Sequence, residues 1–394
     1  MMEGRVLVIG AGFLQSFVIR RARDMGLHVV AVDKDPNAVG LALAHVSEIV
    51  DVLDREACLE VAKREEVDGV LSVSTDFAVR TVSFVAESLG LPGLSTGAAR
   101  ACTNKAVMRR ILAEAGVGTV AHASAKSPGE ATAAASGIGF PCILKPVDSV
   151  GSRGVSRVDD VSQVHGAFES AREVSASGEV IVEEFVEGPE VSVEAITAGG
   201  DTTIAAVTDK ITSGPPHFVE LGHTQPSAFS GQDSIGQTVR GCIAALGIDW
   251  SGSHTELRLS ADGIRVMEVG ARLGGDRITS DLVPLSTGID LMESVVLLAL
   301  GRRPEVRRLR EKGAAIRYAA VYPGLVEAVE GIEAARSVRG VTDVVVDVRA
   351  GDVVPELRSS ADRVAHVVAQ GADAREAGAA AEEAVSKIRI RVTS

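Results

Sequence analysis

The sequence is poor in aromatic residues and in cysteine. Only 3% of its 394 residues are Phe, Trp or Tyr, and its cysteines are Cys58, Cys102, Cys142 and Cys242. They form no CxxC pair, and no histidine lies near them at metal-ligand spacing. A disulfide framework and a cysteine-based zinc site are therefore not expected. We interpret the cysteines as small buried residues of a protein in a reducing compartment.

Long apolar runs and an excess of basic charge are also missing. The longest apolar run, Val295 to Leu300, is far shorter than the roughly 20 residues that span a bilayer. The first residues lack the basic and apolar regions of a signal peptide. The formal net charge of −13 argues against nucleic acid as a partner. We predict a cytoplasmic protein that binds neither nucleic acid nor membranes.

The chain is long enough for two or three domains, because a single core stops growing at roughly 250–300 residues. Strand-like runs at 5–9 and 29–33 alternate with helical segments to about residue 92, which predicts a parallel sheet with helices on both faces. Gly10 to Gln15, followed by Asp33, is similar to a dinucleotide-binding turn, but Gln15 replaces the third glycine. An NAD-dependent oxidoreductase is an alternative that only this fragment supports. The helix that starts here could also receive another anion, such as a substrate carboxylate.

Two glutamates flank a predicted β-hairpin. Ala261-Asp262-Gly263 suits a three-residue loop with glycine in the left-handed position. If Ser260 then pairs with Ile264, Glu256 lies directly opposite Glu268, and a like-charge pair of this kind destabilises a sheet. A divalent cation removes the repulsion. Mg2+ takes one or two protein carboxylates and completes its shell with water and phosphate oxygens, and Mn2+ could replace it.

The residues around this hairpin give the pair a specific setting. Val266 and Ile264 are expected on the carboxylate face, so that this face is not simply exposed to water. Arg272 follows Glu268 by four residues and shares its face if the strand persists. A fixed cation beside two metal-binding acids is what phosphoryl transfer requires. The alternative is a solvated hairpin whose glutamates repel weakly.

Two lysines and a loop of small residues are candidates for binding phosphates. Lys105 opens a helical stretch, and Lys145 ends a strand before Pro146, which disfavours helix at that lysine. The loop 147–155 follows, and glycine-rich loops can wrap phosphates with backbone N–H groups. Taken alone, this loop is more typical of a hairpin turn. The strand after it, from Val180, meets Gly188-Pro189, which predicts a hinge with an edge open to a planar base.

Taken in order, several motifs resemble the ATP-grasp superfamily of ATP-dependent ligases over roughly the whole chain. The motifs are Thr103-Asn104-Lys105, Gly139 to Pro146, Gly151 to Val155, Val182 to Phe185 with Gly188-Pro189-Glu190, and His254-Thr255-Glu256 with Met267 to Arg272. The resemblance implies an α/β protein with a Rossmann-like amino-terminal domain, a two-lobed ATP-grasp domain with a lid, and a small β-rich α+β carboxyl-terminal subdomain. We predict these domains at 1–117, 118–310 with the lid at about 118–185, and 311–394. Strands at 314–321 and 341–347 and a helix at 373–388 are expected in the last.

The resemblance also implies ATP as cofactor, with Mg2+ or Mn2+, and assigns roles to individual residues. Those implied to bind ATP phosphates are Lys105, Lys145, Ser152, Arg153 and Gly154. Those implied to bind the adenine and the ribose are Glu183, Glu184, Val186 and Glu190. Those implied to hold the metal and the transferred phosphoryl group are Glu256, Glu268 and Arg272. Two positions depart from the family pattern, because many members have Asp at position 104 and Asn at position 270, where this chain has Asn and Gly.

The stretch from Asp209 to Ser227 resembles the region before the metal hairpin in amino-acid ligases. The groups that would grip an amino acid are Lys210, Glu220, His223 and His254, although a lone histidine is more often an ordinary core residue. The predicted reaction is ADP-forming: a carboxylate becomes an acyl phosphate, and an amine then gives an amide. The alternatives are a bicarbonate-activating carboxylase or carbamoyl-phosphate type of enzyme and a non-catalytic ATP-binding sensor. Small molecules are the expected partners. The oligomeric state is left open, although homodimers are common among soluble enzymes.

Overall fold

A parallel sheet opens the chain, as predicted. The computed structural model describes residues 3–151, 153–215 and 217–393. The strands β1 (Arg5–Ile9), β2 (His28–Asp33), β3 (Val46–Ile49) and β4 (Gly69–Leu71) pair in the order β3-β2-β1-β4. Each of these pairings is parallel. The helices beside them are α1 (Phe13–Asp24), α2 (Arg55–Arg64) and α3 (Val79–Leu89). Both faces of the sheet are covered, because α1 packs in one apolar cluster while α2 and α3 pack in another.

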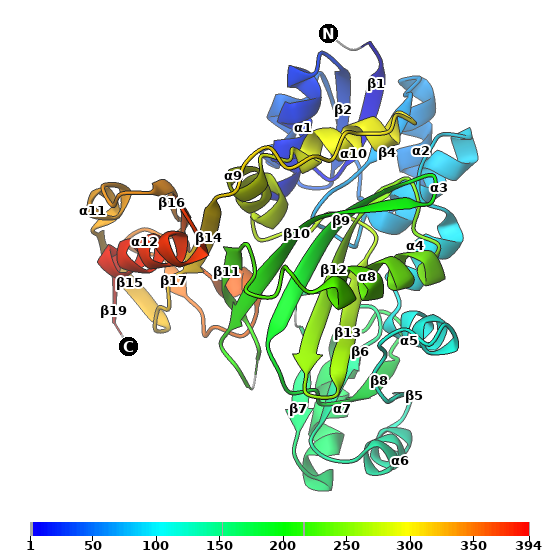
Figure 1. Cartoon of the computed structure of the whole chain (residues 1–394), viewed down its shortest axis with the longest axis vertical. Coiled ribbons are helices and arrows are strands. Elements are labelled where there is room, and N and C mark those ends of the chain that lie inside the picture. The colour runs from blue at the N-terminus through cyan, green and yellow to red at the C-terminus, as the bar shows by residue number, and fades with distance from the viewer. Residues whose placement is uncertain (1–2, 152, 216, 394) are drawn as a thin grey trace.

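A small separate sheet forms the predicted lid, at the bottom of Figure 1. Its strands are β5 (His122–Ala125), β6 (Cys142–Pro146), β7 (Ser156–Val158) and β8 (Val180–Glu184), in the order β5-β8-β6-β7. The helices α6 (Pro128–Ile138) and α7 (Val164–Val174) cover it and share its apolar core. Before the lid come α4 (Thr96–Cys102) and α5 (Lys105–Glu114), which pack with the central sheet.

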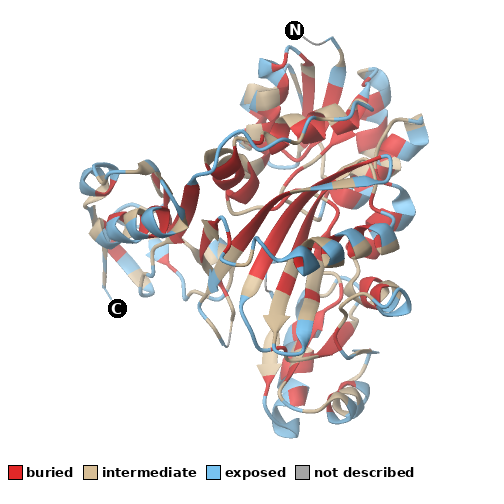
Figure 2. Cartoon of the chain, in the orientation of Figure 1, coloured by how far each residue is buried: buried red, intermediate tan, exposed pale blue. Residues whose placement is uncertain are grey.

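The central sheet has eight strands and continues from the middle of the chain into its carboxyl-terminal part. Its order is β13-β12-β9-β10-β11-β14-β18-β16. The bounds are β9 (Glu190–Ala198), β10 (Asp201–Thr212), β11 (Glu220–Gln225), β12 (Ser251–Ser260), β13 (Gly263–Gly270), β14 (Gly313–Tyr318), β16 (Val341–Val346) and β18 (Ala365–Gly371). The helix α8 (Asp233–Leu246) lies along it. Figure 2 shows the middle strands as buried along most of their length.

The carboxyl-terminal part adds a second small sheet. Its strands are β15 (Gly324–Glu330), β17 (Val353–Val354) and β19 (Arg389–Thr393), in the order β17-β15-β19. The helices of the carboxyl-terminal part are α11 (Ile332–Arg336) and α12 (Ala374–Lys387). The strands β14 and β16 and the helix α12 match the three elements predicted for this part, and the mixed α/β class with a β-rich end is confirmed.

Two short helices connect the central sheet to the first domain. They are α9 (Val283–Thr287) and α10 (Leu291–Ala299), after a helical turn at Ile278–Leu282. The helix α10 packs against α1 and β4, within the same apolar cluster as the first sheet. In the described part of the chain, no single helix has the length and apolarity to cross a membrane; the segments Ile278–Thr287 and Leu291–Ala299 reach them only together, across a 117° bend.

Candidate active site

The two hairpin glutamates face each other as predicted, but by a different route. Glu256 on β12 pairs with Glu268 on β13. Ser260 pairs with Gly263 rather than Ile264, so the loop has two residues and the predicted three-residue loop is wrong. The register is restored by an extra residue, Met267, which lies between the Leu257–Val266 and Glu256–Glu268 pairs. A β-bulge therefore compensates for the shorter loop.

This bulge changes which side chains share the carboxylate face. Val266 pairs with Leu257 and packs with it in the apolar core, where Ile264 also makes contacts. The expectation that Val266 and Ile264 lie beside the glutamates is therefore wrong, because it assumed unbroken alternation along the strand. Met267 and Glu268 instead both line a pocket between the lid and the central sheet.

Arg109 on α5 holds the bulge and was not predicted. Its side chain is fully buried, and it donates to the carbonyl oxygens of Val266 and Met267. Its Nε and Nη2 also donate to the two carboxylate oxygens of Glu183 at 2.7 and 3.0 Å. The only sequence signal is its place between the buried residues Met108 and Leu112 of an amphipathic helix.

The first of two pockets lies between the lid and the central sheet, and we call it the lid pocket. It has a volume of about 150 Å³. Among the predicted residues that line it are Lys105, Lys145, Arg153, Glu183, Glu184, Val186, Glu190, Glu256 and Glu268. The predicted residue Ser152 lies outside the described residues. Gly154 has a left-handed φ of +72°, and a Cβ at this position would lie only 2.4 Å from Val174 Cγ2, so the loop needs a glycine here.

Buried charges of opposite sign meet on one wall of the lid pocket. The Nζ of Lys145 lies 2.7 Å from Glu183 Oε2. Burial acts to raise the pKa of Glu183, but the charges of Arg109 and Lys145 outweigh it and lower that pKa to about 2. Burial lowers the pKa of Lys145 and outweighs the charge of Glu183, which acts to raise it, while the charges of Arg109 and Lys105 act in the same direction as burial. An anion bound here would oppose that effect, because it favours the charged form of the lysine.

Lys105 connects this wall to the metal hairpin. Its Nζ donates to the carbonyl oxygen of Ser149 at 2.8 Å and lies 3.3 Å from Glu268 Oε1. Its position is fixed by the start of α5, where the Asn104 side chain accepts from the N–H of Val107 as the N-cap. Asn104, one of the departures from the family pattern, thus performs the capping role that Asp would perform.

The opposite end of the lid pocket is aromatic. The rings of Phe185 and Phe218 lie 6.3 Å apart, and the guanidinium of Arg258 lies 5.7 Å from the first ring and 6.0 Å from the second. Arg258 also donates to Glu190 at 3.0 Å and to the carbonyl oxygen of Val186 at 2.8 Å. Neither phenylalanine side chain was predicted to take part. Apolar faces with a few fixed polar groups suit a flat heteroaromatic ring.

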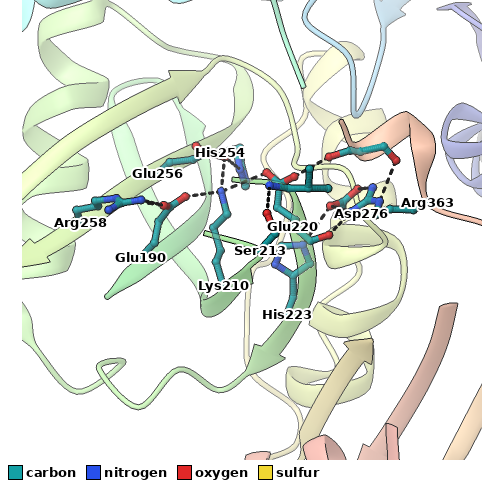
Figure 3. A network of polar contacts seen from close by, with 12 residues as sticks. Glu190, Lys210, Ser213, Glu220, His223, His254, Glu256, Arg258, Asp276 and Arg363 are labelled. Atoms are coloured by element: carbon teal, nitrogen blue, oxygen red, sulfur yellow. Dashed lines mark hydrogen bonds and ion pairs between the residues drawn. The ribbon is translucent and has the colours of Figure 1, made fainter. Parts of the chain in front are cut away.

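Lys210 lies among three carboxylates, one of which is the predicted substrate residue Glu220 (Figure 3). Its Nζ lies 2.7 Å from Glu190, 2.9 Å from Glu256 and 3.6 Å from Glu220. Burial acts to lower the pKa of Lys210, but the three carboxylates outweigh it and raise that pKa well above its ordinary value. The ammonium is therefore positive at neutral pH and connects the two pockets.

The second pocket has walls from all three parts of the chain, and we call it the three-domain pocket. Its volume is about 360 Å³. Leu14 and residues 74–77 come from the first domain, and Ser360 comes from the carboxyl-terminal part. It contains the predicted residues Lys210, Glu220, His223, His254, Glu256, Glu268 and Arg272. The two pockets share Val150, Gly151, Glu256 and Glu268, so they meet at the glutamate pair.

His254 is held between two carboxylates. Its Nδ1 bonds to Glu194, and its Nε2 lies 3.3 Å from Glu256 Oε1. Burial acts to lower the pKa of His254, but the charge of Glu194 outweighs it and raises that pKa to about 9. Glu194 was not predicted; its signal is a lone acid in an apolar stretch of β9. The imidazolium thus contacts Glu256, and its side chain also lines the three-domain pocket, where the sequence predicted a substrate contact.

The carboxyl-terminal part fixes the far end of the three-domain pocket. Arg363 makes a two-point bond to Asp276 at 2.6 and 2.8 Å, and Asp276 also lies 3.2 Å from His223 Nε2. The Oγ of Ser360 donates to Glu220 at 2.6 Å. Burial acts to raise the pKa of Asp276, but Arg363 and His223 lower it overall. The sequence did not reveal Asp276, Ser360 or Arg363 as parts of the site.

The glutamate pair suits a metal that takes few protein ligands. In the part of the chain that the structure describes, no group of three or more His, Cys, Asp or Glu side chains has metal-binding geometry. Glu256 and Glu268 are opposed on neighbouring strands and line both pockets. Such a pair fits Mg2+, which takes its other ligands from water and phosphate. Lysines at 2.9 and 3.3 Å neutralise the two carboxylates.

The glycine-rich turn of the first domain is filled by its own side chains. Gln15 Nε2 donates to the carbonyl oxygen of Val73 at 2.7 Å, and a Cβ on Gly12 would lie 3.0 Å from Gln15 Oε1. Asp33 accepts from the N–H of Ala11 at 2.8 Å. Asp33 and Gln15 thus stabilise the turn itself. This arrangement gives no support to the oxidoreductase alternative.

Comparisons with known families and relatives find ligase-like sequences over most of the chain. An ATP-grasp domain model matches residues 138–281, and a model described as L-amino acid ligase C-terminal domain 2 matches residues 317–393. A formate-dependent phosphoribosylglycinamide formyltransferase of Thioalkalivibrio sulfidiphilus is 30% identical, over 98% of this chain and 97% of the relative. Human carnosine synthase 1 is 28% identical, over 79% of this chain and 42% of that protein.

A solved structure of L-amino acid ligase from Bacillus licheniformis is similar along its whole length. Its TM-score is 0.86 and its identity is 25%, over 99% of this chain and 99% of that one. Ser360 and Arg363 lie on the connection between β17 and β18, within the range of the L-amino acid ligase model. The likeness therefore includes the part of the chain that closes the three-domain pocket.

Proposed function

Because the chain belongs to the ATP-grasp superfamily, we propose that it is an ADP-forming ligase that joins a carboxylate to an amine, with an amino acid as one substrate. A carboxylate oxygen attacks the γ-phosphorus of ATP, the bond to ADP breaks, and an acyl phosphate forms. The amine then attacks the acyl carbon and loses a proton, and phosphate leaves. The product is an amide.

The observation that carries this proposal is the meeting of two pockets at one pair of glutamates. The lid pocket has cations at one end and aromatic rings at the other, as ATP requires. The three-domain pocket holds charges of both signs, as an amino acid requires. Glu256 and Glu268 line both. A phosphoryl group bound at this junction would be within reach of groups in either pocket, and alignment of the reactants is the main contribution of the enzyme.

In the lid pocket, Lys105 and Lys145 would neutralise the phosphates, together with the loop that contains Arg153 and Gly154. Phe185 and Phe218 would flank the adenine, and the backbone of Glu184 and Val186 would meet its edge. Glu183 supports Lys145 and Arg109 rather than standing free, since both of its oxygens are bonded. Glu190 would accept the ribose hydroxyls while it keeps its bonds to Lys210 and Arg258.

Mg2+ would be held by Glu256 and Glu268, and it would supply charge stabilisation for the phosphates. Arg272 would bind the transferred phosphoryl group, since its guanidinium lines the three-domain pocket near that junction. Lid closure would exclude the water that otherwise hydrolyses the acyl phosphate.

Glu220 is the group best suited to an amino-acid ammonium. Its Oε2 accepts from Ser360, whereas its Oε1 has, among the described residues, only Lys210 as a polar partner, at 3.6 Å. His223 has a buried Nδ1 without a hydrogen-bond partner among the described residues, and its side chain lines the same pocket. We propose that these two residues receive the amino acid.

A second candidate uses a smaller carboxylate. The formate-dependent relative matches nearly the whole chain, so formate could be the activated acid and a larger amine the acceptor. The bicarbonate-activating alternative has support from the fold alone, through structures such as biotin carboxylase of Campylobacter jejuni at 18% identity and a TM-score of 0.74.

The test is an ADP- and phosphate-release screen of amino acids, formate and other small carboxylates, alone and in pairs. We expect release that requires both a carboxylate and an amine. Formation of AMP and pyrophosphate would contradict the proposal. ADP release that needs only bicarbonate and an amine would favour the carboxylase alternative, and ATP binding without turnover for any pair would favour the sensor.

A further inference from the structure

An ion pair joins the first domain to the candidate phosphoryl-binding arginine. The Oδ1 of Asp76 accepts from Arg272 Nε at 3.0 Å, and its Oδ2 accepts from Nη2 at 2.6 Å. The two side chains are 9% and 15% exposed. A two-point bond of this type fixes both the position and the rotation of the guanidinium. Nη1 keeps only a long contact of 3.4 Å, to the carbonyl oxygen of Leu273.

The loop that presents Asp76 is attached to the same segment by its backbone. The N–H and the Oγ of Ser74 donate to the carbonyl oxygens of Leu273 and Gly274, each at 3.1 Å. Ser74 itself has a φ of +60°, which is unusual for a residue other than glycine. Strained backbone of this kind persists where surrounding contacts determine it, and it gathers at functional sites.

Gly270 provides the space for this ion pair. A Cβ at this position would lie 3.2 Å from Arg272 Cζ and 3.3 Å from Asp76 Oδ1. A larger side chain would therefore press on both partners. The glycine that departs from the family pattern thus has a structural reason, since a carboxylate from the first domain lies where a side chain from β13 would project.

We propose that Asp76 is a positioning residue that holds the Arg272 guanidinium ready for the γ-phosphoryl group. The inference rests on the proposed function, in which Arg272 binds that group. The first domain would then take part in phosphoryl transfer without touching the nucleotide. Preorganised groups of this kind need no rearrangement when charge develops.

The charge of Asp76 and its positioning role predict opposite effects of its removal on the binding of a triphosphate. A carboxylate near the phosphates repels them, so its removal would strengthen the binding of a triphosphate. Loss of a positioning group would weaken that binding instead. The diphosphate lacks the γ-phosphoryl group, so it serves as an internal reference in both cases.

The test measures the affinities of the full-length protein for MgADP and for the magnesium complex of a non-hydrolysable ATP analogue by calorimetry. In Arg272→Lys and in Asp76→Asn, we expect the affinity for the analogue relative to MgADP to fall by roughly tenfold, the scale of one charge-assisted hydrogen bond. Asp76→Glu keeps the charge but moves the carboxylate, and the same fall is expected. Asp51→Asn is the matched control and should not change the ratio, because this carboxylate of the same domain is 40% exposed and does not line either pocket.

Each outcome decides the inference. An unchanged ratio or tighter analogue binding in folded Asp76→Asn and Asp76→Glu overturns it. If nucleotide binding needs a higher Mg2+ concentration while the ratio of the two affinities is unchanged, Asp76 would belong to the metal site, and the inference would also be overturned. If Arg272→Lys alone lowers the ratio, only the role of Asp76 fails. If neither residue affects the ratio, the proposed role of Arg272 fails as well. Thermal melting identifies any variant that does not fold, and Asp76→Glu then provides the measurement.

Discussion

The lid pocket and the three-domain pocket are built in different ways. The lid pocket takes its walls from residues 105–268, that is, from the lid, α5 and the central sheet. The three-domain pocket also needs the first domain and the carboxyl-terminal part, through residues such as Asp76 and Ser360. Under the proposed function, the nucleotide site would thus be independent of the first domain and the carboxyl-terminal part, which shape the second site.

Glu268→Gln should break both pockets at once and have the largest effect. The amide keeps the volume of the carboxylate but loses its charge toward the metal, so we expect turnover to fall by orders of magnitude. ADP release measures the loss, and circular dichroism tests whether the fold is spared. Wild-type turnover, or an unfolded protein, would contradict the assignment of Glu268.

Glu183→Gln should damage the lid pocket and leave the three-domain pocket intact. It leaves Arg109 and Lys145 buried without a counter-charge, and we expect the free energy of unfolding at neutral pH to fall by about 3 kcal/mol. Chemical denaturation measures this change. The KM for ATP should also rise, since Lys145 loses its partner at 2.7 Å.

The same substitution gives a prediction for acid stability. The pKa of Glu183 is about 2 in the folded protein, below its ordinary value of 4.5. A carboxyl group whose pKa is lowered by folding stabilises the protein above the ordinary value, and this contribution is lost as the pH falls toward the folded value. The difference in unfolding free energy between the wild type and Glu183→Gln should therefore shrink between pH 4.5 and 2. A constant difference would contradict the ion-pair assignment.

Arg363→Gln should affect the three-domain pocket and spare the lid pocket. It removes the two-point bond to Asp276, whose backbone has a left-handed φ of +52°. We expect the KM of the amino-acid substrate to rise roughly thirtyfold, equivalent to about 2 kcal/mol, with the KM for ATP unchanged. Arg363→Lys keeps the charge but cannot make the two-point bond, so its KM for the amino-acid substrate should lie between those of the wild type and Arg363→Gln. Equal rises in both KM values would show that the pockets are not independent.

Ser360→Ala should be the mildest of these changes. It removes one hydrogen bond to Glu220 and no charge. We expect the KM of the amino-acid substrate to rise roughly fivefold, or about 1 kcal/mol, with kcat nearly unchanged. Steady-state kinetics with the substrate pair found in the release screen measure both constants. Ser386→Ala, which also removes one hydroxyl hydrogen bond but on an exposed turn of α12 outside the pocket, is the matched control.

The sequence predicted the lid pocket better than the three-domain pocket, for a physical reason. Lys145 and Glu190 belong to short local motifs, where neighbours such as Pro146 and Gly188 reveal the backbone. Asp76 and Arg363 reach the site from opposite ends of the chain, and no local pattern reports that contact. The hairpin is a third case. The pairing of Glu256 with Glu268 was predicted, but the two assumptions behind it, a three-residue loop and a strand without a bulge, were both wrong.

The continuous eight-stranded sheet limits how the enzyme can open and close. Because β11 pairs with β14, the carboxyl-terminal part cannot swing away without breaking backbone hydrogen bonds of a sheet. The lid has a sheet and an apolar core of its own. Under the proposed function, the lid is therefore the part that we expect to move when ATP enters and ADP leaves.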